Sequence, residues 1–127
     1  RLTRHIREAA VRNVAILSGD VHEAWAGTIH LNPADPASPA VAGEFVATSI
    51  SSDGDGSEVR PSTARVLARN PHIAFFNNRR GYCVHEITPA RMTATFRGLD
   101  HVSRPGAAVT DKGVFVLEDR DPLAKKS

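Results

Sequence analysis

The chain has 127 residues, with 16 lysines and arginines against 14 aspartates and glutamates, and therefore a formal net charge of +2. This length fits one compact domain at most, and a hydrophobic fraction of 41% is sufficient for a core. The aromatic fraction of 6% and the lack of a dense basic run argue against a nucleic-acid-binding module, and no apolar run approaches the ~20 residues of a membrane span.

Neither the single cysteine nor the first residues point to a compartment. Cys83 cannot form an internal disulfide, and we expect it to be a small buried apolar residue. The chain begins at Arg1 without an initiator methionine or an apolar signal segment. We therefore expect it to be part of a larger protein.

The first elements indicate an α/β arrangement. Apolar residues recur at helical spacing over residues 2–10, which predicts a short amphipathic helix that ends near Asn13. The continuous apolar run at 14–17 then predicts a strand buried on both faces. A helix followed by a buried strand is typical of α/β proteins.

Two more strands are predicted in the middle of the chain. Residues 25–31 alternate between two faces, which predicts a half-exposed strand. Residues 32–42 contain three prolines and are predicted to form a loop. A strand at 43–50 and a polar, glycine-rich loop at 51–57 follow.

Six further segments are predicted after this loop. In chain order they are a helix at 61–69, a short apolar segment at 73–76, a hairpin of strands at 82–87 and 92–98, a last strand at 114–117, and an unfolded polar tail at 119–127. About two helices and six short strands favour a sheet-rich α/β or α+β class.

The most informative local feature is the sequence LSGDVH at residues 17–22, where a predicted buried strand ends at glycine. In an extended segment, side chains two positions apart point the same way, so Asp20 and His22 can converge on one point. A carboxylate with an imidazole suits iron, manganese or zinc, and the carboxylate alone suits calcium. Open α/β sheets also place ligands at the carboxyl ends of their strands. The alternative is that Asp20 caps a turn and His22 is a surface or satisfied core histidine.

Residues 49–56 (SISSDGDG) form a second candidate, with two carboxylates, two glycines and three serines. This composition is compatible with an ion-binding loop. It lacks the closing glutamate of an EF-hand and the lysine of a phosphate-binding loop. The simpler interpretation is a solvated turn.

A third candidate is the pair Arg79 and Arg80, which lies in a polar turn at the entrance of a predicted strand. Guanidinium groups can hold a phosphate through their planar set of donors, although only one of two neighbouring strand residues can face a given site. His72 could add a further ligand or a proton donor. The alternatives are surface charge for the arginines and a loop cap for His72.

Five sequence blocks together closely resemble the C-terminal part of the alkaline phosphatase D (PhoD-like) family, within the calcineurin-like metallophosphoesterases. In chain order they are NVAILSGDVH at 13–22, EFVATSI at 44–50, NPHI at 70–73, FNNRRGY at 76–82 and VSRP at 102–105. The resemblance extends from residue 13 to about residue 118. It implies that residues 1–118 are the C-terminal portion of a two-sheet α/β/β/α sandwich whose upstream half is absent, with 119–127 as a polar tail.

The resemblance implies a phosphomonoesterase or phosphodiesterase that uses a metal-activated hydroxide for in-line attack on phosphorus. It assigns catalytic and metal-binding roles to Asp20 and His22, with iron and calcium as the family's metals and other divalent metals possible. Arg79, Arg80 and His72 are then candidates for binding the phosphate ester.

The family's other ligands belong to an upstream half that this chain lacks, so we expect the chain alone to be inactive. The missing N-terminal half of the same polypeptide is the implied partner. The full-length parent is expected to be extracytoplasmic.

Two alternatives remain open at this point. One is a noncatalytic binding or interaction module with the same fold. The other is a zinc hydrolase complete in itself, which requires a third ligand, and His72 is its candidate.

Overall fold

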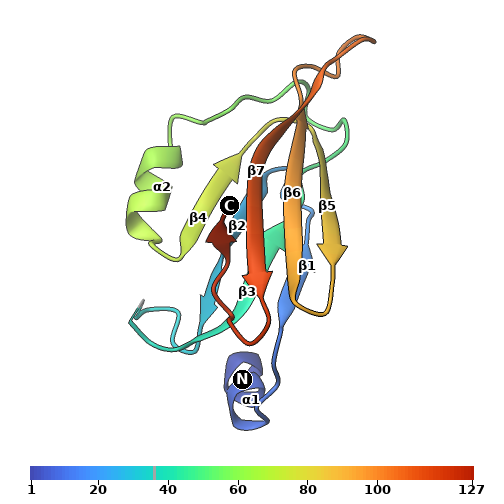
Figure 1. Cartoon of the computed structure of the whole chain (residues 1–127). Helices are drawn as coiled ribbons and strands as arrows, with labels where there is room; N and C mark the ends of the chain where they lie inside the picture. The colour runs from blue at the N-terminus through green and yellow to red at the C-terminus, as the bar shows by residue number, and fades with distance from the viewer. Residues whose placement is uncertain (36) are drawn as a thin grey trace.

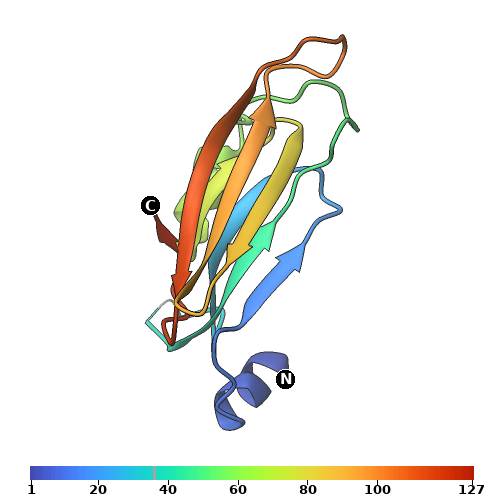
Figure 2. The same cartoon turned by 45° about the vertical axis from the view of Figure 1, so that its right-hand side comes forward.

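A computed structural model describes residues 1–35 and 37–127, which form two four-stranded sheets and two short helices (Figures 1 and 2). The helices are α1 (Leu2–Glu8), at one end of the molecule before the first strand, and α2 (Thr63–Arg69), beside the strand that follows it (Figure 1). Within the described residues, neither helix is long and apolar enough to cross a membrane.

The first sheet brings several chain segments together at one edge, namely the edge formed by the ends of its strands. Its strands, in spatial order, are β1 (Ala15–Ser18), β3 (Ala40–Val46), β2 (Ala24–His30) and β4 (Ile73–Asn77). β1 pairs parallel with β3, and the other two pairings are antiparallel. The carboxyl ends of β1, β3 and β4 therefore lie beside the start of β2. As a result, the turn at 19–23, the loop after β3 and residues 78–80 meet at this edge.

The second sheet is an antiparallel meander in which each strand pairs with its neighbours in the chain. Its strands are β5 (Gly81–Ile87), β6 (Arg91–Leu99), β7 (Val109–Glu118) and β8 (Lys125–Lys126). Figure 2 shows this sheet in front of the first one.

The core lies between the two sheets and arises from side-chain alternation. Buried residues alternate with more exposed ones along β6 and along the second half of β7. The buried apolar cluster comprises Ala24, Ala26, Phe45, Met92, Ala94, Phe96, Phe115 and Leu117. Phe115 is fully buried, and burying a phenylalanine side chain stabilises a fold by about 1.5–3 kcal/mol.

The predicted sheet-rich α/β class is confirmed, as are the helix before residue 70 and the hairpin of β5 and β6.

Cys83 is half-buried against the core, and burial raises the pKa of its thiol to about 12. This environment suits the apolar role predicted for it. Pro36, in the predicted loop, lies outside the described residues.

The prediction that residues 14–17 form a strand buried on both faces is wrong. Within the described chain, β1 pairs with β3 alone, so β1 is an edge strand of the first sheet. Leu17 is 53% exposed, so at least one face of β1 is open at this position. An apolar run predicts a strand, but it does not reveal how many neighbours that strand has.

The C-terminal predictions also need correction. The last long strand is β7, which is longer than the predicted 114–117, and the tail is partly folded because β8 pairs with β7. Asp121 accepts a backbone hydrogen bond from Leu123 and pairs with Lys125. These local contacts turn the chain back onto β7, and a purely compositional argument does not reveal them.

Two predicted boundaries shift as well. α1 ends at Glu8 instead of near Asn13, because Ala10 and Asn13 both adopt left-handed backbone, with φ of 50° and 59°. β3 occupies Ala40–Val46 instead of 43–50, so it begins within the predicted loop. The residues after Val46 are thereby free to form the loop at the edge of the first sheet.

Candidate functional site

The turn between β1 and β2 carries the two predicted metal ligands. Asp20 and His22 have φ values of 75° and 54°, so both adopt the left-handed conformation. The extended geometry predicted for residues 20–22 is therefore wrong. Left-handed backbone costs an ordinary residue roughly 1–2 kcal/mol, and such strain is concentrated at functional sites. Asp20 is exposed and His22 is partly exposed, so both side chains remain accessible.

His22 contacts a carboxylate from a distant part of the chain. Its Nδ1 lies 2.6 Å from Oδ2 of Asp53, in the loop after β3, and the two side chains are 38% and 67% exposed. The hydrogen bond and the charge interaction with His22 lower the pKa of Asp53. An ionised carboxylate only accepts hydrogen bonds, so Nδ1 of His22 carries the N–H of this contact, and in the neutral ring the lone pair available to a ligand is on Nε2.

The second carboxylate of this loop serves another contact. Asp55 accepts hydrogen bonds from the backbone N–H groups of Val102 and Ser103, at 2.7 and 2.8 Å, and from the Ser103 hydroxyl at 3.0 Å. The backbone hydrogen bonds are the main reason that the pKa of Asp55 is lowered. Asp53 and Asp55 thus have separate partners, and Asp55 fastens the loop to the turn between β6 and β7.

Arg80 forms hydrogen bonds that hold the loop after β3 in place. It is 1% exposed, and its Nη1 donates to Oγ of Ser49 at 3.1 Å and to the carbonyl oxygen of Ser52 at 2.7 Å. Its Nη2 donates to the carbonyl and side-chain oxygens of Asn78. Burial lowers the pKa of this guanidinium. The prediction that Arg80 docks the phosphate ester does not agree with this placement, because the side chain is buried among loop oxygens.

The other predicted substrate-binding residues lie in different places. Arg79 is 27% exposed, lies 3.4 Å from Glu58 and donates to the carbonyl oxygen of Asp100, and it follows β4 at the same edge of the sheet as Asp20. His72 precedes β4, and its carbonyl oxygen accepts the N–H of Thr28. The five residues of β4 separate His72 from the candidate site by roughly 15 Å. His72 is therefore not placed to be a third ligand beside Asp20 and His22.

Sequence reasoning missed one further cation at this edge. Nε of Arg60 lies 2.7 Å from Oε1 of Glu23, the residue after His22, and the Arg60 side chain is 46% exposed. Arg60 also donates to Oδ1 of Asn78 at 3.3 Å. No periodicity or motif in the sequence points to Arg60. Asp53 lies in the candidate ion-binding loop at 49–56, but nothing in that sequence identifies His22 as its partner.

Two of the described side chains could contribute to a metal site. Asp20 could supply carboxylate oxygens, and His22 could supply Nε2 because Asp53 occupies its other ring nitrogen. Among residues 1–35 and 37–127, no group of three or more His, Cys, Asp or Glu side chains is arranged to hold a metal. Two donors do not complete the coordination shell of iron or zinc, so further ligands must come from elsewhere.

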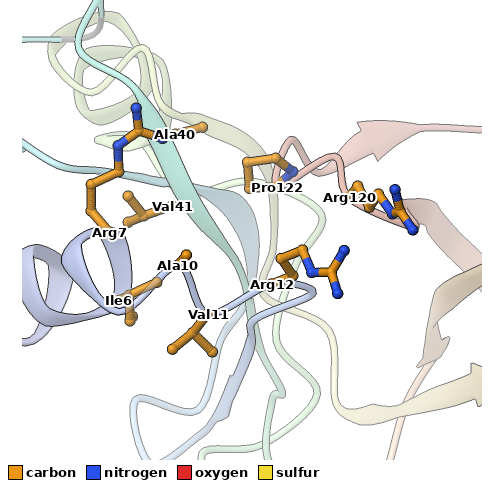
Figure 3. A pocket seen from close by; sticks show the side chains of 9 residues that line it. All are labelled: Ile6, Arg7, Ala10, Val11, Arg12, Ala40, Val41, Arg120 and Pro122. Atoms are coloured by element: carbon orange, nitrogen blue, oxygen red, sulfur yellow. The ribbon is translucent and has the colours of Figure 1, made fainter.

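A groove of about 590 Å³ lies away from this edge. Its lining residues come from α1 and the segment after it, the start of β3, and the segment before β8 (Figure 3). They are Ile6, Arg7, Ala10, Val11, Arg12, Ala40, Val41, Arg120 and Pro122. The groove is bordered by the part of the chain that leads into β1, whereas Asp20 follows the other end of that strand. The two features are therefore separate.

Gly56 lies where the loop after β3 is tightly packed against its neighbours. It has a φ of +67°, and a Cβ atom there would lie 1.9 Å from the carbonyl oxygen of Asn78. Gly54 has a nearly identical φ of +69° but no neighbour within 4 Å of such an atom. Gly54→Ala should cost about 1 kcal/mol of stability through backbone strain alone, and Gly56→Ala at least about 2 kcal/mol more. Urea unfolding midpoints of both variants measure the difference, and equal midpoints would contradict this packing.

The two facing sheets, with a Gly-Asp-Val-His turn at the end of β1, form a two-sheet sandwich. A solved structure described as "Structure of PhoD" is similar to this chain, with a TM-score of 0.94 and 37% sequence identity. The match covers 99% of this chain and 24% of the chain in that structure. The family model of the PhoD-like phosphatases matches residues 1–96. The chain belongs to the PhoD-like phosphatase family.

A curated relative supports the same conclusion. The chain is 39% identical over 128 residues to alkaline phosphatase D of Bacillus subtilis strain 168. The alignment covers all of this chain and 22% of that protein. The chain thus spans less than a quarter of the length of either relative.

Proposed function

We propose that this chain supplies part of the active site of a metal-dependent phosphoric ester hydrolase of the alkaline phosphatase D type. In this proposal Asp20 and His22 are metal ligands, and the remaining ligands come from the rest of the parent protein. We further propose iron and calcium as the metals, with Asp20 on calcium or in a bridging position and His22 on iron. This division follows the hard character of carboxylate oxygen and the borderline character of imidazole nitrogen.

The observation that carries the proposal is the geometry of the turn after β1. Asp20 and His22 both adopt left-handed backbone, both are accessible, and His22 has one ring nitrogen committed to Asp53. Strained backbone at two residues of such a short turn costs stability, so a functional reason for it is expected. Binding of a metal by these side chains would supply that reason.

The chain's own residues have separate tasks in this proposal. Asp20 and His22 bind the metal, which when bound supplies Lewis-acid activation of a water nucleophile and neutralises charge on the phosphoryl group. Arg79 lies at the same edge and can hold an anionic phosphate ester through its guanidinium donors. Arg80 acts on the loop instead, since its side chain is buried.

The proposal is tested with the full-length parent protein. We expect it to hydrolyse p-nitrophenyl phosphate or bis(p-nitrophenyl) phosphate, to lose this activity on treatment with a chelator, and to regain it when metal is restored. The isolated 127-residue chain with the same metals is the control, and it should show no turnover because it provides two ligands.

Two outcomes would contradict the proposal. A parent protein that binds no metal would favour a noncatalytic module with the same fold. Zinc-dependent turnover by the isolated chain would favour a self-contained hydrolase instead. The relative rates on the monoester and the diester would also identify the substrate class.

A further inference from the structure

The contact between His22 and Asp53 joins two turns that are 31 residues apart in the chain. A histidine ring can rotate, and either of its nitrogens can carry the proton of the neutral form. A metal ligand needs one defined nitrogen, held in one direction. A carboxylate at 2.6 Å from Nδ1 satisfies both requirements, because it fixes the proton on Nδ1 and restricts the ring.

Asp53 is itself held in place, although its side chain is largely exposed. On the N-terminal side of Asp53, Arg80 donates hydrogen bonds to Ser49 and Ser52. On its C-terminal side, Asp55 accepts a hydrogen bond from the backbone N–H of Val102. Ser57 and Asn78 then exchange two backbone hydrogen bonds, at 3.1 and 3.3 Å. Contacts on both sides of Asp53 therefore define where its carboxylate lies.

Two arginines, Arg60 and Arg80, also contact this part of the molecule, but their hydrogen bonds and ion pairs go to other groups. Neither arginine forms the short contact that His22 makes, and Arg60 pairs with Glu23. The short contact of the Asp53 carboxylate is thus with His22, in the turn after β1.

We propose that Asp53 is a positioning residue, which orients the His22 ring so that Nε2 faces the metal. This inference rests on the proposed function, in which His22 is a metal ligand. Histidine ligands in general donate their second N–H to a carboxylate, a carbonyl or a water, and loss of that partner lowers metal affinity or activity by about 10- to 100-fold.

The choice of variants follows from the backbone. Asp53 has a φ of 68°, which glycine and asparagine tolerate, so Asp53→Gly removes the carboxylate without new strain. Asp53→Asn keeps an acceptor oxygen and removes the charge. Asp111→Asn is the matched control, because Asp111 is an exposed carboxylate on β7 that pairs with Arg97.

The first measurement is metal affinity in the full-length protein, by calorimetric titration of the metal-free form with iron and with calcium. For the metal bound by His22, we expect Asp53→Gly to weaken binding about 10- to 100-fold, and Asp53→Asn to weaken it less. The control should bind as the wild type does. The expected ranking separates loss of the hydrogen bond from loss of one negative charge.

The second measurement reports on the His22 ring without metal or activity. In metal-free protein with 15N-labelled histidine, at a pH where the ring is neutral, the side-chain nitrogen shifts show which nitrogen carries the proton. The His22 signal is assigned by its absence from the His22→Gly variant. We expect the proton on Nδ1 in the wild type and a shift toward Nε2 in Asp53→Gly.

The outcomes distinguish this inference from the proposed function. Wild-type affinity in Asp53→Gly together with weakened binding in His22→Gly would overturn the positioning role and leave the metal site intact. A wild-type proton on Nε2 would overturn the positioning role in the same way. Undiminished metal binding by His22→Gly would overturn the proposed function, and the positioning role with it.

Discussion

Replacement of Asp20 or His22 by glycine in the full-length parent protein is expected, under the proposed function, to remove bound metal and to lower kcat/KM for p-nitrophenyl phosphate by at least about 100- to 1000-fold. Loss of one direct electrostatic stabiliser of a transition state has an effect of about this size. Glycine is the appropriate replacement because both positions have positive φ, so the variants lose a ligand without gaining backbone strain. Metal content and steady-state kinetics measure the two effects together.

Val21→Ala provides the matched control, since Val21 lies between the two ligands and is 55% exposed. It should retain metal and activity close to those of the wild type. Near-normal turnover with retained metal in Asp20→Gly or His22→Gly would refute the ligand assignment.

Arg80→Met is expected to destabilise the protein by about 3 kcal/mol, because it removes a charged donor from buried oxygen acceptors. The oxygens of Asn78 and the carbonyl of Ser52 lose their donor, and methionine fills only part of the space. The loop after β3 then loses its main support, so metal affinity should fall as well. The urea unfolding midpoint, at unchanged m value, measures the stability change.

The neighbouring residue gives a direct comparison for this variant. Arg79 is partly exposed, and Arg79→Met should cost less than about 1 kcal/mol of stability while it raises KM for the phosphate ester. The reverse result, with Arg80→Met stable and impaired only in KM, would restore Arg80 as the residue that contacts substrate.

Much of the fold could be predicted because it depends on local patterns. Alternation along β6 and the turn at Thr88 and Pro89 indicate a hairpin without any knowledge of distant contacts. The turn that holds Asp20 and His22 was recognised for a similar reason, since an apolar run that ends at Gly19 marks the end of a strand. Its left-handed conformation was not predicted, because neither residue is a glycine.

The contacts that complete the site could not be predicted from local patterns. Asp53 reaches His22 only because β1 and β3 are parallel neighbours, and that pairing is a property of the whole sheet. The burial of Arg80 is contrary to the usual behaviour of arginine, which is rarely fully buried. It depends on the oxygens of Asn78, which is two residues away, and also on those of Ser49 and Ser52, which are 31 and 28 residues away in the chain.

The connectivity of the two sheets has a consequence for the order of folding. Each strand of the second sheet pairs with its neighbour in the chain, so that sheet forms by short loop closures, which are the fast ones. The contacts of the candidate site require longer closures, of 31 residues for His22 with Asp53 and 48 for Asp55 with Ser103. The meander of β5, β6 and β7 should therefore form first. The turn with Asp20 and His22 should then acquire its final shape late, on a surface that is already folded.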